Sequence, residues 1–182
     1  MAKKIVKNKK LLHGLQLEKL KYKKIRRSLL MEHHKNHQMT HDTSGKLPEG
    51  IKTAQHPKYP LGTKVILDSD HMQDMIGAEA TVVGVFDTHS YAVTYIDTDS
   101  GMVMENHRWV IQEETKENSP AIQVGDTIVI QTDHMSGMDG ATATVDEVID
   151  EPIYMVDYIS TETGEVIENH KWVSESEIRG TV

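Results

Sequence analysis

The sequence contains no cysteine among its 182 residues. Disulfide bonds, thiolate metal sites and a cysteine nucleophile are therefore excluded, while the redox compartment stays undetermined. Aromatic residues are also scarce, with two tryptophans, one phenylalanine and six tyrosines. No run of about 18 apolar residues occurs, so the sequence predicts no membrane-spanning helix. No apolar signal-peptide core follows the basic start either.

Motifs of catalysis are missing as well. The sequence has no Ser-His-Asp order, no glycine-rich phosphate loop and no HExxH motif. Carboxylates are plentiful, but a site that is repeated in two small domains is more typical of binding than of turnover. We therefore expect a protein that is not an enzyme.

Charge is unevenly distributed along the chain. Residues 1–30 carry eleven Lys or Arg and one acidic residue, for a net charge of +10, and the rest of the chain has a net charge of −18. Phosphate contacts supply most of the affinity for nucleic acids, so the acidic body is predicted not to bind them. The basic arm, residues 1–30, is predicted to be disordered or partly helical. Its functional alternative is contact with anionic membrane lipid or nucleic acid.

An internal duplication is the most informative feature of the sequence. The stretch DHMQDMIGAEATV begins at Asp70, and DHMSGMDGATATV begins at Asp133, 63 residues later and without a gap. From Leu61 to Val110, 24 of 50 positions are identical to their partner in the second copy. Each copy is one structural unit. The predicted organisation is a basic arm at 1–30, a His/Met-rich segment and linker at 31–60, a first repeat at 61–113, a spacer at 114–123 and a second repeat at 124–178.

Each repeat contains four or five short strand-like segments separated by turns. Tyr91, Val93 and Tyr95, for example, alternate onto one face of a strand. Repeats of about 50 residues lie near the lower limit for a sufficient core, so we expect the two to pack on each other. The pattern predicts an all-β protein of two tandem SH3-like small β-barrels. One β-sandwich built from both repeats is the alternative. A helical turn is also predicted at 174–178, with Ser174 and Glu177 forming its cap.

The DHMxxMxG loop of each repeat carries soft metal ligands. One imidazole and two thioethers form a neutral set that suits Cu(I) and suits Mg²⁺ or Ca²⁺ poorly. The aspartate before each histidine can accept the second ring N–H, as carboxylates around metal sites commonly do. The candidate ligands are His71, Met72, Met75, His134, Met135 and Met138, with Asp70, Asp133, His107 and His170 as supporting or structural residues.

The same residues also have a structural interpretation. Methionine is a common core filler, so the repeated HMxxM could close each barrel as a hydrophobic plug. Aspartate and histidine would then be a satisfied polar pair. The NH[RK]W motif, at residues 106–109 and 169–172, would be a structural corner with its tryptophan packed inside. On this interpretation the repeats form a tandem SH3-like interaction module that binds a peptide or a cell-envelope polymer.

A His-rich tract precedes the repeats. Residues 31–42, MEHHKNHQMTHD, contain four histidines and two methionines. Short tracts of this composition are typical of metal binding, and thioether sulfur favours Cu(I). A polar linker that happens to be rich in histidine is the alternative. The candidate ligands here are His33, His34, His37, Met39 and His41.

The repeated pattern resembles that of the YdhK-type family of Gram-positive bacteria. This family carries a doubled domain of unknown function with the pattern VGDxVxIxxDHMxGMxGAxATV…YxVxYxxxxxGExxxNHKWVxExEL. The resemblance covers residues 57–178 and agrees in motif, order and spacing. It extends to the His/Met-rich stretch before the repeats.

The resemblance carries functional implications. Members of the family are typically lipid-anchored surface proteins, and CopL-like members sequester copper outside the cell. The resemblance therefore implies Cu(I) sequestration or buffering linked to copper tolerance, through the His and Met residues of the two loops. No metal is expected to be essential for folding. The chain as written carries no lipobox cysteine, which leaves open whether it is a cytoplasmic member or a chain whose natural start differs.

Overall fold

The computed structural model describes residues 42–182, which form ten strands and two single turns of 3-10 helix. The prediction of an all-β protein is confirmed. Within this part of the chain, no helix is long and apolar enough to cross a membrane. The basic arm at 1–30 and the tract residues lie outside the described residues, the latter being His33, His34, His37, Met39 and His41.

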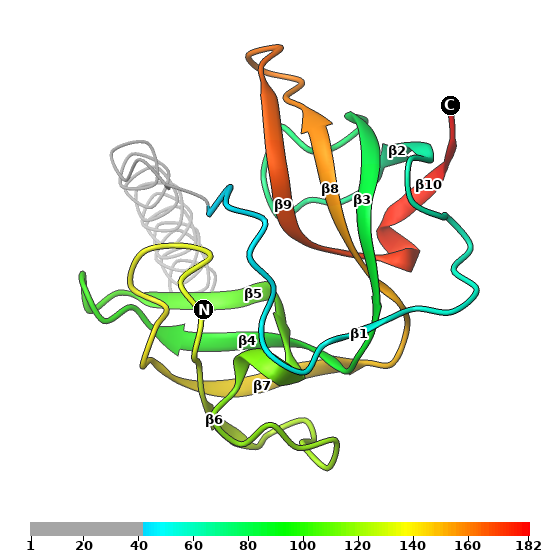
Figure 1. Ribbon diagram of the computed structural model, residues 1–182. Helices are drawn as coiled ribbons and strands as arrows, with labels where there is room; N and C mark the ends of the chain where they lie inside the picture. The colour runs from blue at the N-terminus through cyan, green and yellow to red at the C-terminus, as the bar shows by residue number, and fades with distance from the viewer. Residues whose placement is uncertain (1–41) are drawn as a thin grey trace, which may run out of the picture. The chain divides into compact units, whose positions relative to one another are not determined.

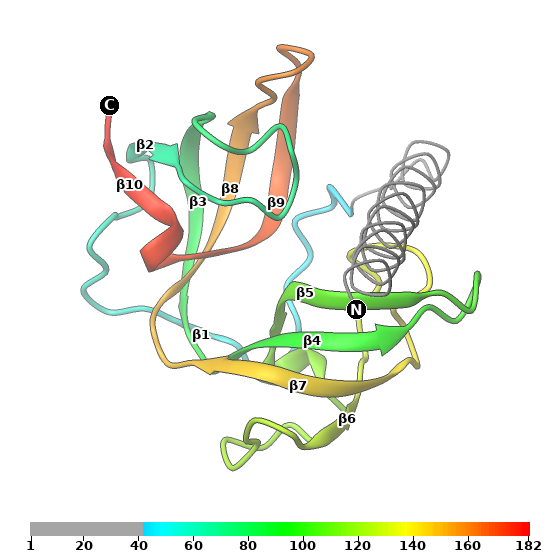
Figure 2. The same cartoon turned by 180° about the vertical axis from the view of Figure 1, so that it is seen from behind.

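The strands form two sheets, called sheet A and sheet B. Sheet A has the order β10 (Ile178–Thr181), β2 (Lys64–Leu67), β3 (Glu79–Asp87), β8 (Ile153–Ile159) and β9 (Val166–Ser174), and β1 (Lys52–Thr53) also pairs with β3 (Figure 1). Sheet B has the order β5 (Val103–Ile111), β4 (Ser90–Ile96), β7 (Thr142–Ile149) and β6 (Thr127–Val129) (Figure 2). Neither sheet of residues 42–182 is closed, so the SH3-like barrels expected from the sequence are not confirmed.

Each sheet is built from both repeats. Strand β3 of the first repeat pairs antiparallel with β8 of the second, and β4 of the first pairs antiparallel with β7 of the second. Sheet A thus joins the first half of one repeat to the second half of the other, and sheet B joins the remaining halves. This differs from the expected arrangement of one barrel per repeat, because the repeats exchange strands.

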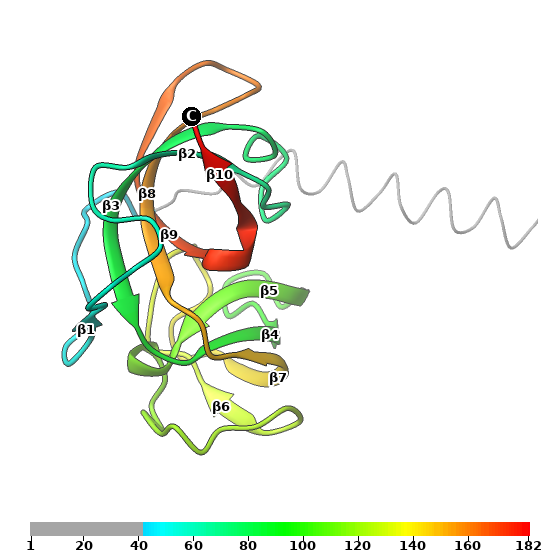
Figure 3. The same ribbon diagram turned by 90° about the vertical axis from the view of Figure 1, so that its right-hand side faces the viewer.

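The connections within each repeat explain this exchange. Only Thr88 and His89 separate β3 from β4, and only residues 150–152 separate β7 from β8. Tight hairpin turns of this length need a residue with positive φ, which Pro152 cannot adopt and which no glycine supplies here. The chain instead turns a corner from one sheet into the other. Strands β3–β4 and β7–β8 therefore run together as one bent two-stranded ribbon shared by both sheets (Figure 3).

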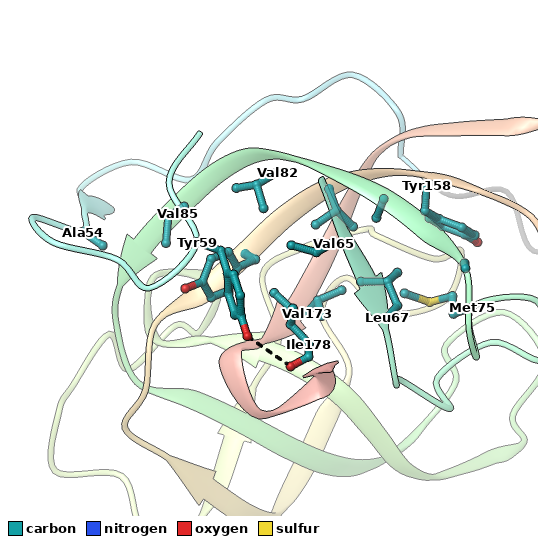
Figure 4. Close-up of a cluster of buried hydrophobic side chains, with 14 residues drawn as sticks. Ala54, Tyr59, Val65, Leu67, Met75, Val82, Val85, Tyr158, Val173 and Ile178 are labelled. Carbon is teal, nitrogen blue, oxygen red and sulfur yellow. Dashed lines mark hydrogen bonds between the residues drawn. The ribbon is translucent and has the colours of Figure 1, made fainter. Parts of the chain in front are cut away.

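Sheet A curves around a hydrophobic core, which is formed by apolar side chains that alternate along its strands. Figure 4 shows Leu67, Met75 and Tyr158 in this core, together with Tyr59, whose hydroxyl donates to the Ile178 carbonyl at 3.5 Å. The counterparts of the core residues on sheet B are buried as well, at Ile128, Ile130, Met138, Val145 and Tyr95. The two halves of the molecule are therefore packed in equivalent ways.

A further cluster packs residues of both sheets together. Trp109 of β5 and Trp172 of β9 belong to it, and both tryptophans are buried, which agrees with the structural interpretation of the NH[RK]W motif. Phe86 at the end of β3 meets Trp172 edge-on, with 5.6 Å between ring centroids. Because β5 belongs to sheet B and β9 to sheet A, the tryptophans tie the two sheets together.

Candidate functional site

The histidine of the first loop is buried against a glutamate of the second repeat. His71 Nε2 lies 2.5 Å from Glu177 Oε1, and the His71 side chain is only 6% exposed. The other carboxylate oxygen, Oε2, accepts hydrogen bonds from Trp109 Nε1 at 2.8 Å and from the Ser174 backbone N–H at 2.9 Å. The rings of His71 and Trp109 meet edge-on at 6.1 Å. Each oxygen of this buried carboxylate therefore has at least one donor.

The second loop repeats this arrangement with the repeats reversed. His134 Nε2 lies 2.5 Å from Glu114 Oε1. Glu114 Oε2 accepts from Trp172 Nε1 at 3.1 Å and from the Ile111 backbone N–H at 3.2 Å. The rings of His134 and Trp172 meet edge-on at 6.1 Å. We call these two groups, His71–Glu177–Trp109 and His134–Glu114–Trp172, the His–Glu–Trp clusters.

The two glutamates occupy equivalent positions in the fold. Glu114 ends the 3-10 turn η1 (Gln112–Glu114) after β5, and Glu177 ends η2 (Glu175–Glu177) after β9. The helical turn predicted at 174–178 is confirmed as η2. In each cluster the histidine and the tryptophan come from one repeat and the glutamate from the other, because the offset of 63 residues makes Glu114, at the start of the predicted spacer, the first-repeat equivalent of Glu177. A single repeat therefore supplies the histidine and tryptophan of one cluster and the glutamate of the other, but it contains no complete cluster.

The charge of Glu177 determines where the proton of His71 lies. Burial by itself raises the pKa of Glu177, but hydrogen bonds from His71, Ser174 and Trp109 outweigh burial and hold that pKa below its usual value. An ionised carboxylate only accepts hydrogen bonds, so the contact with His71 requires a proton on Nε2. In the neutral ring this leaves a lone pair on Nδ1.

Both histidines carry an Nδ1 atom that has no partner. His71 Nδ1 and His134 Nδ1 are buried without a hydrogen-bond partner. Leaving a buried acceptor unpaired costs about 1–3 kcal/mol, and most such groups in proteins are paired. A soft metal cation bound at Nδ1 would use this lone pair, so the histidines fit the predicted metal.

The methionines of the loops divide into two kinds. Met75 and Met138 are fully buried, and Met75 lies beside Leu67 and Tyr158 in the core of sheet A (Figure 4). Their burial agrees with the interpretation of methionine as a core filler. Met72, next to His71, is only partly buried, and Met135, next to His134, is 8% exposed. Met72 packs against the edge of the sheet A core, and Met135 is also buried, so both differ from Met75 and Met138 only in being slightly more exposed and in following the cluster histidines directly in sequence.

The aspartates before the histidines do not have the predicted role. The sequence predicts Asp70 and Asp133 as partners of the histidine rings, but Glu177 and Glu114 occupy those places. Asp70 instead lies 3.4 Å from Arg108 Nη1. Asp70 and Asp133 are both exposed. Their carboxylates stay in water, because burying a charge beside the histidine ring would remove its hydration.

His107 and His170 make aromatic contacts. The ring of His107 meets Tyr95 edge-on at 5.8 Å, and the ring of His170 meets Tyr158 at 5.4 Å. The Tyr158 hydroxyl in turn donates to Asp74 Oδ1 of the first loop at 3.3 Å. His170 of the second repeat is thus linked through one tyrosine to the loop of the first repeat. These contacts agree with the structural interpretation of the NH[RK]W motif.

The candidate metal ligands depend on methionine. Among residues 42–182, no three histidine, aspartate or glutamate side chains converge in a way that could hold a metal ion. A metal at either His–Glu–Trp cluster would therefore need ligands beyond imidazole and carboxylate. The thioethers of Met72 and Met135 adjoin the cluster histidines in sequence and are of the type that Cu(I) prefers.

Glu114 and the role of Glu177 were missed by reasoning from the sequence. The repeat offset of 63 residues continues past Val110 and pairs Glu114 with Glu177. Extending the comparison of the copies by four residues would have found this pair. Their assignment to the histidine of the opposite repeat could not be found in this way, because it depends on the exchange of strands.

These features define an all-β protein in which two copies of one repeat exchange strands and bury paired His–Glu–Trp clusters. The chain belongs to the family described as "Protein of unknown function (DUF1541)", whose model matches residues 61–112 and 124–175, one match in each repeat. The predicted resemblance to the YdhK-type family is thereby confirmed.

One known protein and two of its structures illustrate the relationship. The chain is 46% identical over 142 residues to YdhK of Bacillus subtilis (strain 168), an alignment that covers 78% of this chain and 69% of YdhK. The crystal structure of YdhK superposes with a TM-score of 0.71 at 46% identity, covering 73% of this chain and 91% of that one. The solution structure of the YdhK C-terminal domain gives a TM-score of 0.64 at 46% identity, covering 66% and 92%.

Proposed function

We propose that this protein is a non-enzymatic Cu(I)-binding protein that sequesters or buffers copper and so contributes to copper tolerance. The observation that carries the proposal is the paired state of His71 and His134. Each ring is buried, each Nε2 is held by a glutamate, and each Nδ1 has no hydrogen-bond partner. An imidazole that is buried, held in one orientation and left with an unused lone pair on Nδ1 is suited to bind a metal ion.

The surroundings of the histidines support this chemistry. Histidines that bind metals usually donate their second ring N–H to a carboxylate or carbonyl, which orients the ring and raises its basicity. Glu177 and Glu114 have this position. Met72 and Met135 follow the two histidines directly and offer thioether sulfur, which selects for Cu(I).

In this proposal the predicted ligands have different roles. His71, Met72, His134 and Met135 are the ligands beside the two clusters. Met75 and Met138 contribute to the cores that support the loops. The tract residues remain additional low-affinity ligands in the proposal, namely His33, His34, His37, Met39 and His41.

A Cu(I) titration in competition with bicinchoninate tests the proposal. Residues 42–182, which lack every histidine and methionine of the tract, are compared with two double variants. We expect saturable binding by the parent, its loss in Met72→Leu/Met135→Leu, and its retention in the matched control Met75→Leu/Met138→Leu. Met-to-Leu changes conserve volume and cost less than about 1.5 kcal/mol each. Absence of Cu(I) binding by the parent would reject the proposal.

The second candidate function is an interaction module of small SH3-like units that binds a peptide or a cell-envelope polymer. It is favoured by exposed apolar pairs that occur in both repeats. Ile96 pairs with Val103 across β4 and β5, and Ile159 pairs with Val166 across β8 and β9. All four are exposed, between 46% and 60%. Co-sedimentation with purified cell walls that is lost in Ile96→Thr/Ile159→Thr, and unaffected by the methionine variants, would support this candidate.

A further inference from the structure

We infer that Glu177 and Glu114 are positioning residues that hold His71 and His134, across the boundary between the repeats, in the tautomer that leaves Nδ1 free to bind metal. The metal part of this inference rests on the proposed function, but the tautomer does not. Its consequence is that each metal site needs both repeats, because the ligand comes from one and the residue that prepares it comes from the other.

The donors around Glu177 fix the orientation of its carboxylate. Oε2 faces two N–H groups, those of Trp109 Nε1 and the Ser174 backbone. Neither group can act as an acceptor, so this position requires an oxygen. Oε1 is the atom left to face His71. The only favourable state of this contact has the ring proton on Nε2.

Glu114 is constrained in the same way. Its Oε2 faces the Trp172 indole N–H and the Ile111 backbone N–H. Its Oε1 faces His134 Nε2 and lies 3.2 Å from the Trp172 nitrogen. The imidazole of His134 must therefore also donate through Nε2. Two independent clusters thus lead to the same tautomer.

Replacing either glutamate by glutamine should reverse the tautomer. In Glu177→Gln, the two fixed N–H donors hold the amide oxygen on their side. The amide NH₂ group then faces His71 and donates to Nε2, which forces the ring proton onto Nδ1. The lone pair on Nδ1 is lost, and with it the proposed ligand atom. The side chain keeps its shape, so the change acts through the proton and not through packing.

The effect crosses between the repeats in a defined pattern. Glu177→Gln changes His71 of the first repeat and leaves His134 unchanged. Glu114→Gln changes His134 of the second repeat and leaves His71 unchanged. A purely structural role of the glutamates does not predict this pattern, because loss of packing would not exchange one ring proton for another.

Nitrogen NMR of the full-length protein, labelled with ¹⁵N-histidine and free of metal at neutral pH, reads the tautomers directly. We expect an unprotonated Nδ1 and a protonated Nε2 for both His71 and His134 in the wild type. We expect the reverse for His71 alone in Glu177→Gln, and for His134 alone in Glu114→Gln. A protonated Nδ1 on either ring in the wild type overturns the inference without the need for any variant. An unchanged tautomer in a folded Glu-to-Gln variant overturns it as well.

Cu(I) titration of the same samples tests the consequence for metal binding. Removing an outer partner of a ligand typically weakens metal binding 10–100-fold. We expect a loss of this size at one loop site in each Glu-to-Gln variant. Glu175→Gln is the matched control, because Glu175 lies in the same turn but accepts from the Tyr154 hydroxyl at 2.9 Å. A loop site that keeps wild-type affinity after Glu177→Gln contradicts the inference. If the wild type binds no Cu(I) while the tautomers behave as expected, the proposed function fails and the positioning role stands.

Discussion

His71 and Glu177 meet at 2.5 Å although 106 residues separate them in the chain. The equivalent contact between His134 and Glu114 spans only 20 residues. The two contacts have the same geometry and opposite direction along the chain, since in one the histidine precedes the glutamate and in the other it follows. This reversal is what an exchange of strands between two copies of one repeat produces. Each His–Glu hydrogen bond therefore joins the two repeats, as the exchange of strands requires.

A single repeat should not fold as a monomer. Residues 57–118 alone expose the faces of β3 and β4 that pair with β8 and β7 in the whole chain. We expect the fragment to be unfolded at low concentration, or to form a homodimer in which each copy takes the place of the missing repeat. Circular dichroism and light scattering after gel filtration distinguish these states. A folded monomeric fragment, measured beside residues 42–182, would contradict the exchange.

The stability of the protein should depend on the charge of Glu177. Burial raises the pKa of Glu177, but hydrogen bonds from His71, Ser174 and Trp109 outweigh burial and hold that pKa below its usual value of 4.5, so the ionised carboxylate stabilises the folded protein above about pH 4.5. The contribution is lost as the pH falls below about 4.5 toward the folded pKa. Glu177→Gln should cost about 1.5–3 kcal/mol at neutral pH, the typical worth of hydrogen bonds to a charged group. The loss should shrink in acid, as measured by urea unfolding at several pH values.

Glu175→Gln is the control for this pH series. Glu175 lies in the same 3-10 turn and contacts Tyr154 instead of a histidine. Its substitution should leave the acid dependence of the urea midpoint close to that of the wild type. An equal flattening of the curve by both variants would assign the acid dependence to the turn as a whole.

Gly137→Ala should destabilise the protein more than Gly140→Ala. Both glycines have positive φ, at +80° and +74°, where an alanine costs about 1–2 kcal/mol. A Cβ at Gly140 would meet nothing within 4 Å, whereas a Cβ at Gly137 would clash with the side-chain carboxylate of Asp97. We therefore expect a further loss of about 1–3 kcal/mol for Gly137→Ala, as for other overpacked sites. Thermal or urea unfolding measures both.

A second substitution tests the origin of that loss. The repeat offset pairs Gly137 with Asp74 and Asp97 with Ser160. One half of the molecule thus has its carboxylate on the loop, and the other half has it on the hairpin turn. Asp97→Ser should therefore recover part of the stability lost in Gly137→Ala. No recovery in the double variant would place the conflict elsewhere.

Trp172→Phe should destabilise the protein through Glu114 as well as through packing. The indole N–H donates to Glu114 at 3.1 Å, and the side chain of Trp172 is fully buried. Loss of one donor to a buried carboxylate costs about 1.5–3 kcal/mol in addition to the lost volume. A double-mutant cycle with Glu114→Gln should show a coupling energy of about 0.5–3 kcal/mol, because the residues are in direct contact. Additive effects would separate the tryptophan from the cluster.

Several features followed from the sequence because they depend on local patterns. The alternation of Tyr91, Val93 and Tyr95 predicted a strand, and all three residues are buried in β4. The offset of 63 residues predicted the equivalence of the two loops, and His71 and His134 have equivalent surroundings. The carboxylate partners were predicted wrongly, because Asp70 and Asp133 are adjacent to the histidines in sequence but exposed in the fold.

Residue order and hydrophobic alternation alone determined that this chain is a duplicated all-β protein and that the loops carry matching histidines and methionines. Only the tertiary structure decided that β3 pairs with β8 and β4 with β7, and that Glu177 and Glu114 orient the histidines of the opposite repeat. The physical reason lies in the duplication itself. Two copies with the same alternation offer each strand edge equivalent partners within its own repeat and in the other, so the pattern cannot choose between them. The short corners at Thr88–His89 and at residues 150–152, together with the shared tryptophan core, make that choice.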